Sequence, residues 1–372
     1  MTDFAPSAMT ALIDEHARYD LAESTCPPVS LSDLADPAEL AGLRLGYGTT
    51  RGGASLRETI ATGVGVAADQ VLVTVGGIAG MFLLAQAVCG PGDRVVLVTP
   101  CFPPALTVPE GLGARIDVVR ASFDDGYRLP LEGIVAALGP RTRLVSLASP
   151  QNPSGVRYTE AELRELLAAM HQRAPQAVIL VDETYRESTY GDAALPASAA
   201  PLSPNVVTCS SVSKAHGAPG LRLGWLTVTD PALYTRLREA KFVTTIACSN
   251  VDEFLAERVL RRSSALLPPR AAFLADRLAE LREWASGQAV DLVVPDGGPL
   301  CCVRLRPEVD VEAFYARLAA AETRVAPGPW FGETERTFRL GLGHLPAAEF
   351  AEALERLASA IVPRRVRVGL GP

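Results

Sequence analysis

Short β-rich apolar runs alternate with helical segments through most of this 372-residue chain. The runs lie at 70–75, 94–100, 115–121, 143–150, 177–183, 205–211 and 223–229. Runs that stay apolar along their whole length are typical of strands buried on both faces of a parallel sheet, with the intervening helices as the covering layers. We therefore predict an α/β fold with a mostly parallel seven-stranded sheet, contained in a large domain over residues 41–265.

The pattern of the chain changes after residue 265. A long helical stretch over 251–286 leads into strand patterns at 290–307 and 337–343, with further helical patterns at 311–321 and 348–362. These elements predict a small α+β C-terminal domain over residues 266–372. Residues 1–40 hold one short helical pattern, at 10–22, and a proline-containing loop. We expect this N-terminal segment to join the small domain, since the chain is long enough for two domains.

Charge and composition exclude several classes of function. A net charge of −7 argues against a nucleic-acid partner, which would need a basic face. We expect no membrane partner, because no stretch is long enough to span a bilayer and the N-terminus carries acids where a signal peptide would be basic. The seven cysteines include no CxxC pair, which favours reduced thiols and a cytoplasmic location. The four histidines lack ligand spacing, so we expect no metal site.

One lysine stands out as a candidate catalytic group. The chain has two lysines, and Lys214 lies between two hydroxyls in the segment SVSKAHGAPGLR (211–222), with glycines and an arginine following. A primary amine is needed to form a reversible imine with a carbonyl compound, while hydroxyls and a guanidinium can hold a phosphate. Lys241 lies in a mixed helical pattern and is expected on a solvated surface. Lys214 is therefore the predicted nucleophile.

Other polar residues follow the predicted strands in the same way. The segment GGIAG (76–80) follows the first strand, Asn152 follows the fourth, Asp182 ends the fifth and Lys214 follows the sixth. Ligands of open α/β sheets bind beyond the carboxyl ends of the strands. Each feature alone has an ordinary explanation, since NPSG (152–155) suits a turn, Asp182 a helix cap and the glycines a helix start. Their shared placement favours a binding site.

These motifs together resemble those of the class I/II aminotransferases, the fold-type-I enzymes that use pyridoxal 5′-phosphate. The resemblance covers nearly the whole chain. The family's S-x-S-K with an arginine eight residues later matches 211–222, its N-P-x-G matches 152–155, and its D-x-x-Y matches 182–185. The resemblance implies the fold, the cofactor, an L-α-amino acid substrate and a homodimer with shared active sites.

The resemblance also assigns roles around the cofactor ring. Lys214 would form the Schiff base, Asp182 would lie under the pyridine nitrogen, and Asn152 and Tyr185 would bond the phenolic oxygen. A carboxylate at that place keeps the ring protonated, and a protonated ring withdraws electrons from the substrate's Cα. The freed Lys214 amine would then act as general base. Phe102 would stack on the ring, although by itself Phe102 looks like a core residue.

The cofactor phosphate and the substrate carboxylate need further donors. By resemblance, the phosphate would be held by the set Gly77, Ile78, Ser211, Ser213 and Arg222, and Tyr47 would come from the neighbouring subunit. Tyr47 could equally be an ordinary loop tyrosine. Arg339, in the apolar strand TFRLGLG, would hold the substrate α-carboxylate, with Arg336 and Arg304 as substitutes. Taken alone, Arg339 would be a surface-edge arginine.

Two places depart from the family's usual pattern. The N-terminal loop reads AESTCPP (22–28), so a larger polar residue fills a position that is usually glycine. His216 stands where the family often has phenylalanine or tyrosine, and we interpret it as a supporting hydrogen-bonding residue. Both changes lie on the substrate side of the cofactor, so they leave the reaction type open.

Three outcomes follow loss of the Cα proton: transamination, β-elimination, and elimination followed by addition or ring closure. The rewritten loop, with Glu23, is similar to the capreomycidine-synthase-like branch, whose members cyclise a hydroxylated arginine in the making of peptide-type antibiotics. Glu23 or Asp20 could pair with the guanidinium of such a substrate. The sequence therefore leaves two main hypotheses, a cyclase of this kind and an aminotransferase. A third hypothesis, a non-catalytic ligand sensor, is disfavoured because such regulators carry an added DNA-binding domain.

Overall fold

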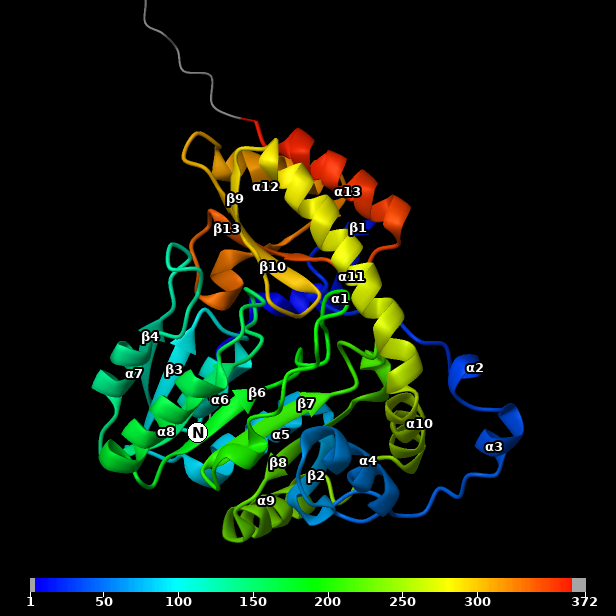
Figure 1. Ribbon diagram of the computed structural model, residues 1–372, viewed down its shortest axis with the longest axis vertical. Helices are drawn as coiled ribbons and strands as arrows, with labels where there is room; N and C mark the ends of the chain where they lie inside the picture. Colours follow the sequence, from blue (N-terminus) through cyan, green and yellow to red (C-terminus); the bar gives the residue numbers. More distant parts are fainter. Residues whose placement is uncertain (1–3, 363–372) are drawn as a thin grey trace, which may run out of the picture.

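The computed structural model describes residues 4–362, and its strands form one large sheet, one smaller sheet and a short two-stranded pairing (Figure 1). The large sheet has seven strands in the order β2-β8-β7-β6-β5-β3-β4. Their bounds are β2 (Val71–Val75), β3 (Arg94–Thr99), β4 (Arg115–Arg120), β5 (Thr142–Ala148), β6 (Val178–Asp182), β7 (Val206–Ser211) and β8 (Leu223–Val228). Every strand lies where the apolar runs predict it, and only β8 runs antiparallel to its neighbours β2 and β7.

The parallel register brings the ends of three strands together. Ala148 of β5 pairs with Asp182 of β6, which pairs in turn with Cys209 of β7. These strands are buried because their side chains meet apolar neighbours on both faces of the sheet. The turns after β5, β6 and β7 therefore leave the sheet at one edge, and these turns carry Asn152, Tyr185 and Lys214.

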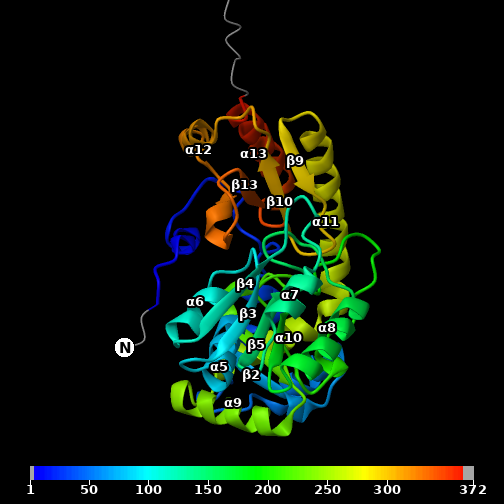
Figure 2. The ribbon, with the colours of Figure 1, turned by 90° about the vertical axis from the view of Figure 1, so that its left-hand side faces the viewer.

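Helices cover both faces of the large sheet (Figure 2). Those associated with it are α4 (Ala54–Val64), α5 (Gly76–Val88), α6 (Pro104–Gly111), α7 (Leu131–Ala137), α8 (Glu160–Arg173), α9 (Pro231–Thr244) and α10 (Asn250–Arg261). Helices α7 and α8 pack in one apolar cluster with the inner residues of the sheet, whereas α5 and α9 pack in the cluster on the opposite face. Short 3-10 turns lie at Ala8–Thr10, Ala68–Gln70, Ala200–Leu202, Pro219–Leu221 and Gly328–Phe331.

The C-terminal part has its own sheet and its own core. Its sheet is antiparallel, in the order β12 (Ala326–Pro327), β13 (Thr337–Gly341), β10 (Leu300–Leu305) and β9 (Val290–Val293). The helices here are α11 (Ser263–Ser286), α12 (Val311–Ala320) and α13 (Ala347–Ala360), and the aromatic side chains Phe314, Phe338 and Phe350 are fully buried among them. The predicted division between 41–265 and 266–372 falls in the first turn of α11 and stays a prediction.

The N-terminal segment differs from its predicted helical pattern. Helix α1 (Ala11–Asp14) ends early, and β1 (Tyr19–Asp20) pairs in parallel with β11 (Thr323–Arg324). The prediction that the helix continues past residue 14 is wrong, because Tyr19 is buried and the backbone of Tyr19 and Asp20 pairs with β11. After the N-terminal loop at 22–28, helices α2 (Leu31–Leu34) and α3 (Pro37–Ala41) follow.

Lys241 also differs from its expected place on a solvated surface. Its side chain on α9 is only 1% exposed, and its Nζ donates to the backbone carbonyl of Thr50 at 2.6 Å. Burial lowers its pKa, while neighbouring Cys248 and Glu253 act to raise it. Lys241 is therefore a structural residue beneath the loop that carries Tyr47.

In the described part of the chain no helix combines the length and apolar character that crossing a bilayer requires.

Candidate active site

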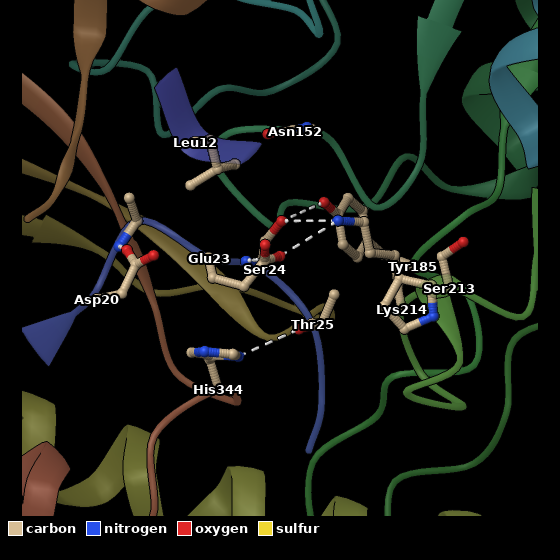
Figure 3. Close-up of polar contacts among 12 residues, drawn as sticks. Leu12, Asp20, Glu23, Ser24, Thr25, Asn152, Tyr185, Ser213, Lys214 and His344 are labelled. Carbon is tan, nitrogen blue, oxygen red and sulfur yellow. Dashed lines mark hydrogen bonds and ion pairs between the residues drawn. The ribbon is translucent and has the colours of Figure 1, made fainter. Parts of the chain in front are cut away.

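Lys214 lies in the turn after β7, where the N-terminal segment crosses it. The carbonyl of Lys214 accepts hydrogen bonds from the backbone N–H groups of Cys26 and Gly217, both at 3.1 Å. Its Nζ lies 3.5 Å from Glu23 Oε1 and 3.4 Å from Ser24 Oγ (Figure 3). The side chain keeps 23% of its surface exposed, so the amine is enclosed but accessible.

Ser24 connects Lys214 to Tyr185. Ser24 is 1% exposed, and its hydroxyl lies 2.8 Å from the Tyr185 hydroxyl (Figure 3). These contacts place a hydroxyl, a phenol and an amine in one short chain of polar groups. From the sequence, Glu23 of this loop is predicted as a substrate partner, and a polar residue is seen to replace a glycine. Sequence reasoning missed Ser24 itself, because the partner residues lie far away along the chain.

Glu23 supplies the negative charge of this cluster. Burial acts to raise the pKa of Glu23, but the charges of Lys214 and Arg339 and the backbone N–H of Ser24 outweigh it and lower the pKa overall. The carboxylate is therefore ionised at neutral pH, with 17% of the side chain exposed. Asp20, the alternative acid, is already paired with Arg324 at 2.5 Å.

Asp182 presents a carboxylate without a cationic partner. Its Oδ1 accepts hydrogen bonds from Thr184 N at 3.0 Å and from Thr184 Oγ1 at 2.5 Å. Within residues 4–362 no Lys, Arg or His side chain forms an ion pair with it, and burial raises its pKa. A carboxylate desolvated in this way favours a cationic ligand. Asp182, Asn152 and Phe102 line one small cavity.

Arg339 is buried rather than at a surface edge. Its side chain is 0% exposed, its Nη1 donates to Asn152 Oδ1 at 2.9 Å, and its Nη2 donates to the carbonyl of Ala22 at 2.6 Å. The guanidinium also lies 4.8 Å from the Phe331 ring centroid. Its Nε has no hydrogen-bond partner, so the group retains a free donor next to the Glu23 loop.

The two substitute arginines lie elsewhere. Arg336 donates to the backbone carbonyls of Arg306 and Val309, and Arg304 pairs with Asp124 at 2.8 Å. Neither of them contacts the residues around Lys214. Arg339 is therefore the arginine that the structure brings to the site.

The start of α5 and Arg222 form an anion cradle. Gly77 and Ile78 belong to the first turn of this 13-residue helix, whose N–H groups carry a partial positive charge. Arg222 adopts a left-handed conformation with φ 46°, and a Cβ added at Gly76 would lie only 2.6 Å from its Nη2. The glycine thus lets a guanidinium approach the helix start, and both groups attract an anion such as a phosphate.

Ser211 and Ser213 lie beside this cradle. Both serines are buried near the end of β7, and Ser213 N donates to Ser211 Oγ at 3.3 Å. Tyr47 lies apart, with 88% of its surface exposed, and it contributes nothing to the site of its own chain. His216 bonds Ser263 instead of facing the substrate side. Phe102, Asn152 and Asp182 line one cavity, and the assignment of these residues to the cofactor stays a prediction.

The chain is similar to known proteins over most of its length. The sequence profile described as aminotransferase class I and II matches residues 17–357. Arginine–pyruvate transaminase AruH of Pseudomonas aeruginosa is 30% identical over 350 residues, which cover 89% of this chain and 86% of that protein. Capreomycidine synthase of Streptomyces vinaceus is 29% identical over 353 residues, covering 92% and 89%.

Solved structures show the same fold. A pyridoxal-phosphate-dependent aminotransferase from Streptococcus suis superposes with a TM-score of 0.88 at 23% identity, covering 96% of this chain and 98% of that one. The pyridoxal-phosphate-dependent cyclase OrfR gives a TM-score of 0.85 at 25% identity, covering 96% and 97%. The unpaired Asp182 carboxylate and the anion cradle at α5 fit the ring and phosphate of that cofactor. The chain therefore belongs to the class I and II aminotransferase family and is a pyridoxal-phosphate-dependent enzyme.

Proposed function

We propose that this enzyme acts on a free L-α-amino acid with a guanidinium side chain and converts a hydroxylated arginine by elimination and ring closure. The observation that carries the proposal is the Glu23 carboxylate, held 3.5 Å from Lys214 Nζ on the loop that covers it. An ionised acid at this distance can pair with a side-chain cation while the substrate's Cα lies at the amine. With Asp20 bound to Arg324, Glu23 is the acid left for this role.

In this proposal each residue of the site has a separate role in the reaction at the substrate's Cα. The bound cofactor supplies an electron sink for the negative charge that develops at the substrate's Cα. Lys214 Nζ removes the Cα proton, and Asp182 holds a positive charge on the pyridine nitrogen. Asn152 and Tyr185 would donate to the ring's phenolic oxygen. Arg339 would hold the substrate α-carboxylate through its guanidinium fork.

The phosphate site and the oligomeric state form a second part of the proposal. Gly77 and Ile78 N–H groups, together with Ser211, Ser213 and Arg222, would hold the phosphate. Tyr47 would complete the phosphate site of a second subunit. The exposure of Tyr47 supports this role, as does that of the neighbouring Leu45, which is 82% exposed. We thus propose a homodimer, in the cytoplasm, with sites shared between subunits.

Ser24 favours elimination over transamination. Transamination needs the Lys214 amine to move the proton a second time, away from Cα to the cofactor. The Ser24 hydroxyl lies within reach of both Nζ and the Tyr185 hydroxyl, at 3.4 and 2.8 Å, and in this proposal these contacts restrain the movement of the amine. A β-hydroxyl on the substrate can then leave, and a guanidine nitrogen can add at Cβ. The similarity to capreomycidine synthase supports this reading and a place in antibiotic biosynthesis.

Transamination of an arginine-type amino acid is the second candidate. The same site residues serve it, and the similarity to arginine–pyruvate transaminase AruH supports it. Glu23 would have the same partner in both reactions, because the guanidinium is common to the two substrates. The two candidates differ in the fate of the substrate after the Cα proton has left.

Substrate recognition is tested by titrating the holoenzyme with L-arginine and L-norleucine while following its visible absorbance. We expect arginine to bind at least about tenfold more tightly than norleucine, because one charge-assisted hydrogen-bond pair raises the affinity by about this factor. Glu23→Gln should remove most of this preference and leave norleucine binding unchanged, and Glu15→Gln on the surface is the matched control. Equal affinity of the wild type for the two amino acids would rule out the guanidinium proposal.

A further inference from the structure

A second cavity lies apart from the residues around Lys214 Nζ. Its volume is about 590 Å³, and it opens between α4, the loop after β6 and the start of α11. None of the predicted cofactor or substrate residues lines it. Ile60, Trp225 and Leu267 supply apolar walls, whereas Glu187, Asp192 and several hydroxyl side chains supply polar ones. A cavity of this size and mixed lining is typical of small-molecule sites.

The charge at this cavity is negative. Glu187 and Asp192 both line it, and among the described residues Asp192 has no charged partner. The one arginine of the lining, Arg186, is already committed: its guanidinium donates to two backbone carbonyls at 3.0 and 3.1 Å and lies 3.4 Å from Glu183. The cavity therefore holds two carboxylates and no available cation.

His216 is uncharged and therefore does not compensate the negative charge of Glu187. The imidazole is 0% exposed, its Nε2 lies 3.0 Å from Ser263 Oγ, and its Nδ1 faces Glu187 Oε2 at 3.8 Å without a hydrogen bond. Burial lowers the His216 pKa more than the Glu187 charge raises it, so the ring is neutral at pH 7. Glu187 and Ser263 both line the cavity. A buried nitrogen without a hydrogen-bond partner thus lies next to the uncompensated carboxylate that lines the cavity.

We propose that this cavity binds a small organic cation, an alkylguanidine, with its charged group on Glu187 and its alkyl part against Trp225 and Ile60. A guanidinium presents two parallel N–H donors, which suit a carboxylate better than a single ammonium does. The Trp225 ring adds a favourable face for the cation or its alkyl chain. A metal ion is a poorer occupant, because no group of three His, Cys, Asp or Glu side chains in residues 4–362 could hold one.

The test is calorimetric titration of the holoenzyme with n-butylguanidinium, which has no α-amino or carboxyl group. We expect a binding event, separate from any at Glu23, whose affinity Glu187→Gln lowers by about tenfold or more, because one charge-assisted pair is lost. Asp192→Asn, at an exposed position, should weaken it less and provides a second variant if Glu187→Gln folds poorly. The uncharged analogue 1-pentanol should bind far more weakly than the guanidinium.

The active-site acid gives the matched control. Because Glu23 is proposed to bind guanidinium groups too, Glu23→Gln must retain the binding event that Glu187→Gln weakens. Heat of binding that disappears in Glu23→Gln but persists in Glu187→Gln and Asp192→Asn would overturn the proposal and assign all binding to the active site. Absence of binding to the wild type, or equal affinity for 1-pentanol, would overturn it as well.

Discussion

Arg339 Nη1 donates to Asn152 Oδ1 at 2.9 Å, and this bond joins the C-terminal sheet to the turn after β5 of the large sheet. The second donor of the guanidinium, Nη2, bonds the carbonyl of Ala22 on the N-terminal loop at 2.6 Å. One buried arginine therefore ties together three segments that are distant in sequence. A substrate carboxylate that reaches Arg339 must displace part of this arrangement, so binding and the position of the Glu23 loop are coupled.

Arg339→Lys should raise KM for the amino acid by about a hundredfold, because an ammonium cannot replace two parallel charge-assisted bonds worth roughly 1.5–3 kcal/mol each. The measurement is steady-state kinetics, with thermal unfolding beside it to detect any loss of stability. Arg336→Lys is the control, since Arg336 bonds backbone carbonyls away from the site. An unchanged KM in Arg339→Lys would mean that the carboxylate binds elsewhere.

Lys214→Ala should abolish turnover and the visible absorbance of the bound cofactor while circular dichroism stays native. The reason is that no other amine lies at the site, as Lys241 is buried against Thr50. Lys241→Met serves as the comparison. It should lower the unfolding temperature, because the Thr50 carbonyl loses its donor, yet retain turnover per folded molecule. Activity that survives in Lys214→Ala would refute the assignment of the catalytic amine.

Glu23 predicts how the stability of the cofactor-free protein depends on pH. Its pKa in the folded protein is lowered from the ordinary value of 4.5. Its stabilising contribution is therefore fully present above pH of about 4.5 and is lost as the pH falls through the folded-state pKa. Urea unfolding between pH 3 and 7 should show wild type and Glu23→Gln converging towards the acid end. A constant difference between them across this range would contradict the lowered pKa.

Ser24→Ala should shift the partition of products towards amino transfer. Removing the hydroxyl frees Lys214 Nζ from its 3.4 Å contact and leaves Tyr185 without its 2.8 Å partner. The ratio of oxo acid to cyclised product, measured in single-turnover reactions, should rise by about tenfold. One hydrogen bond contributes about 1.4 kcal/mol, and this change in activation free energy alters a rate by that factor. Ser24→Thr, which keeps a hydroxyl, should stay near the wild-type ratio. The same ratio in Ser24→Ala and wild type would exclude a role for Ser24 in the outcome.

The sequence predicts the large sheet well for a physical reason. Strands buried on both faces must be apolar throughout, so β2 to β8 stand out from the flanking helices. Asn152, Asp182 and Lys214 follow directly, because turns after neighbouring parallel strands share an edge. In the structure the turns after β5, β6 and β7 carry Asn152, Tyr185 and Lys214, and Phe102 lines a cavity with Asn152 and Asp182, whereas the roles of these residues stay predictions.

Other features depend on contacts that a local pattern does not contain. The β1 pairing involves only two residues and exists because Arg324 lies opposite Asp20. Lys241 sits in a mixed helical pattern, yet a tertiary contact with Thr50 buries it. Ser24 meets Tyr185 across 161 positions of sequence. Such pairs exist only in the folded chain, and among them the Ser24–Tyr185 contact is the one that enters the proposed function.

Product analysis distinguishes the proposed cyclisation of a hydroxylated arginine from amino transfer. The holoenzyme would be incubated with L-β-hydroxyarginine, with and without 2-oxoglutarate, and the products identified by mass spectrometry. We predict a product lighter than the substrate by one water, formed equally well without the oxo acid. An oxo acid derived from the substrate, formed only when 2-oxoglutarate accepts the amino group, would contradict the claim and identify an aminotransferase.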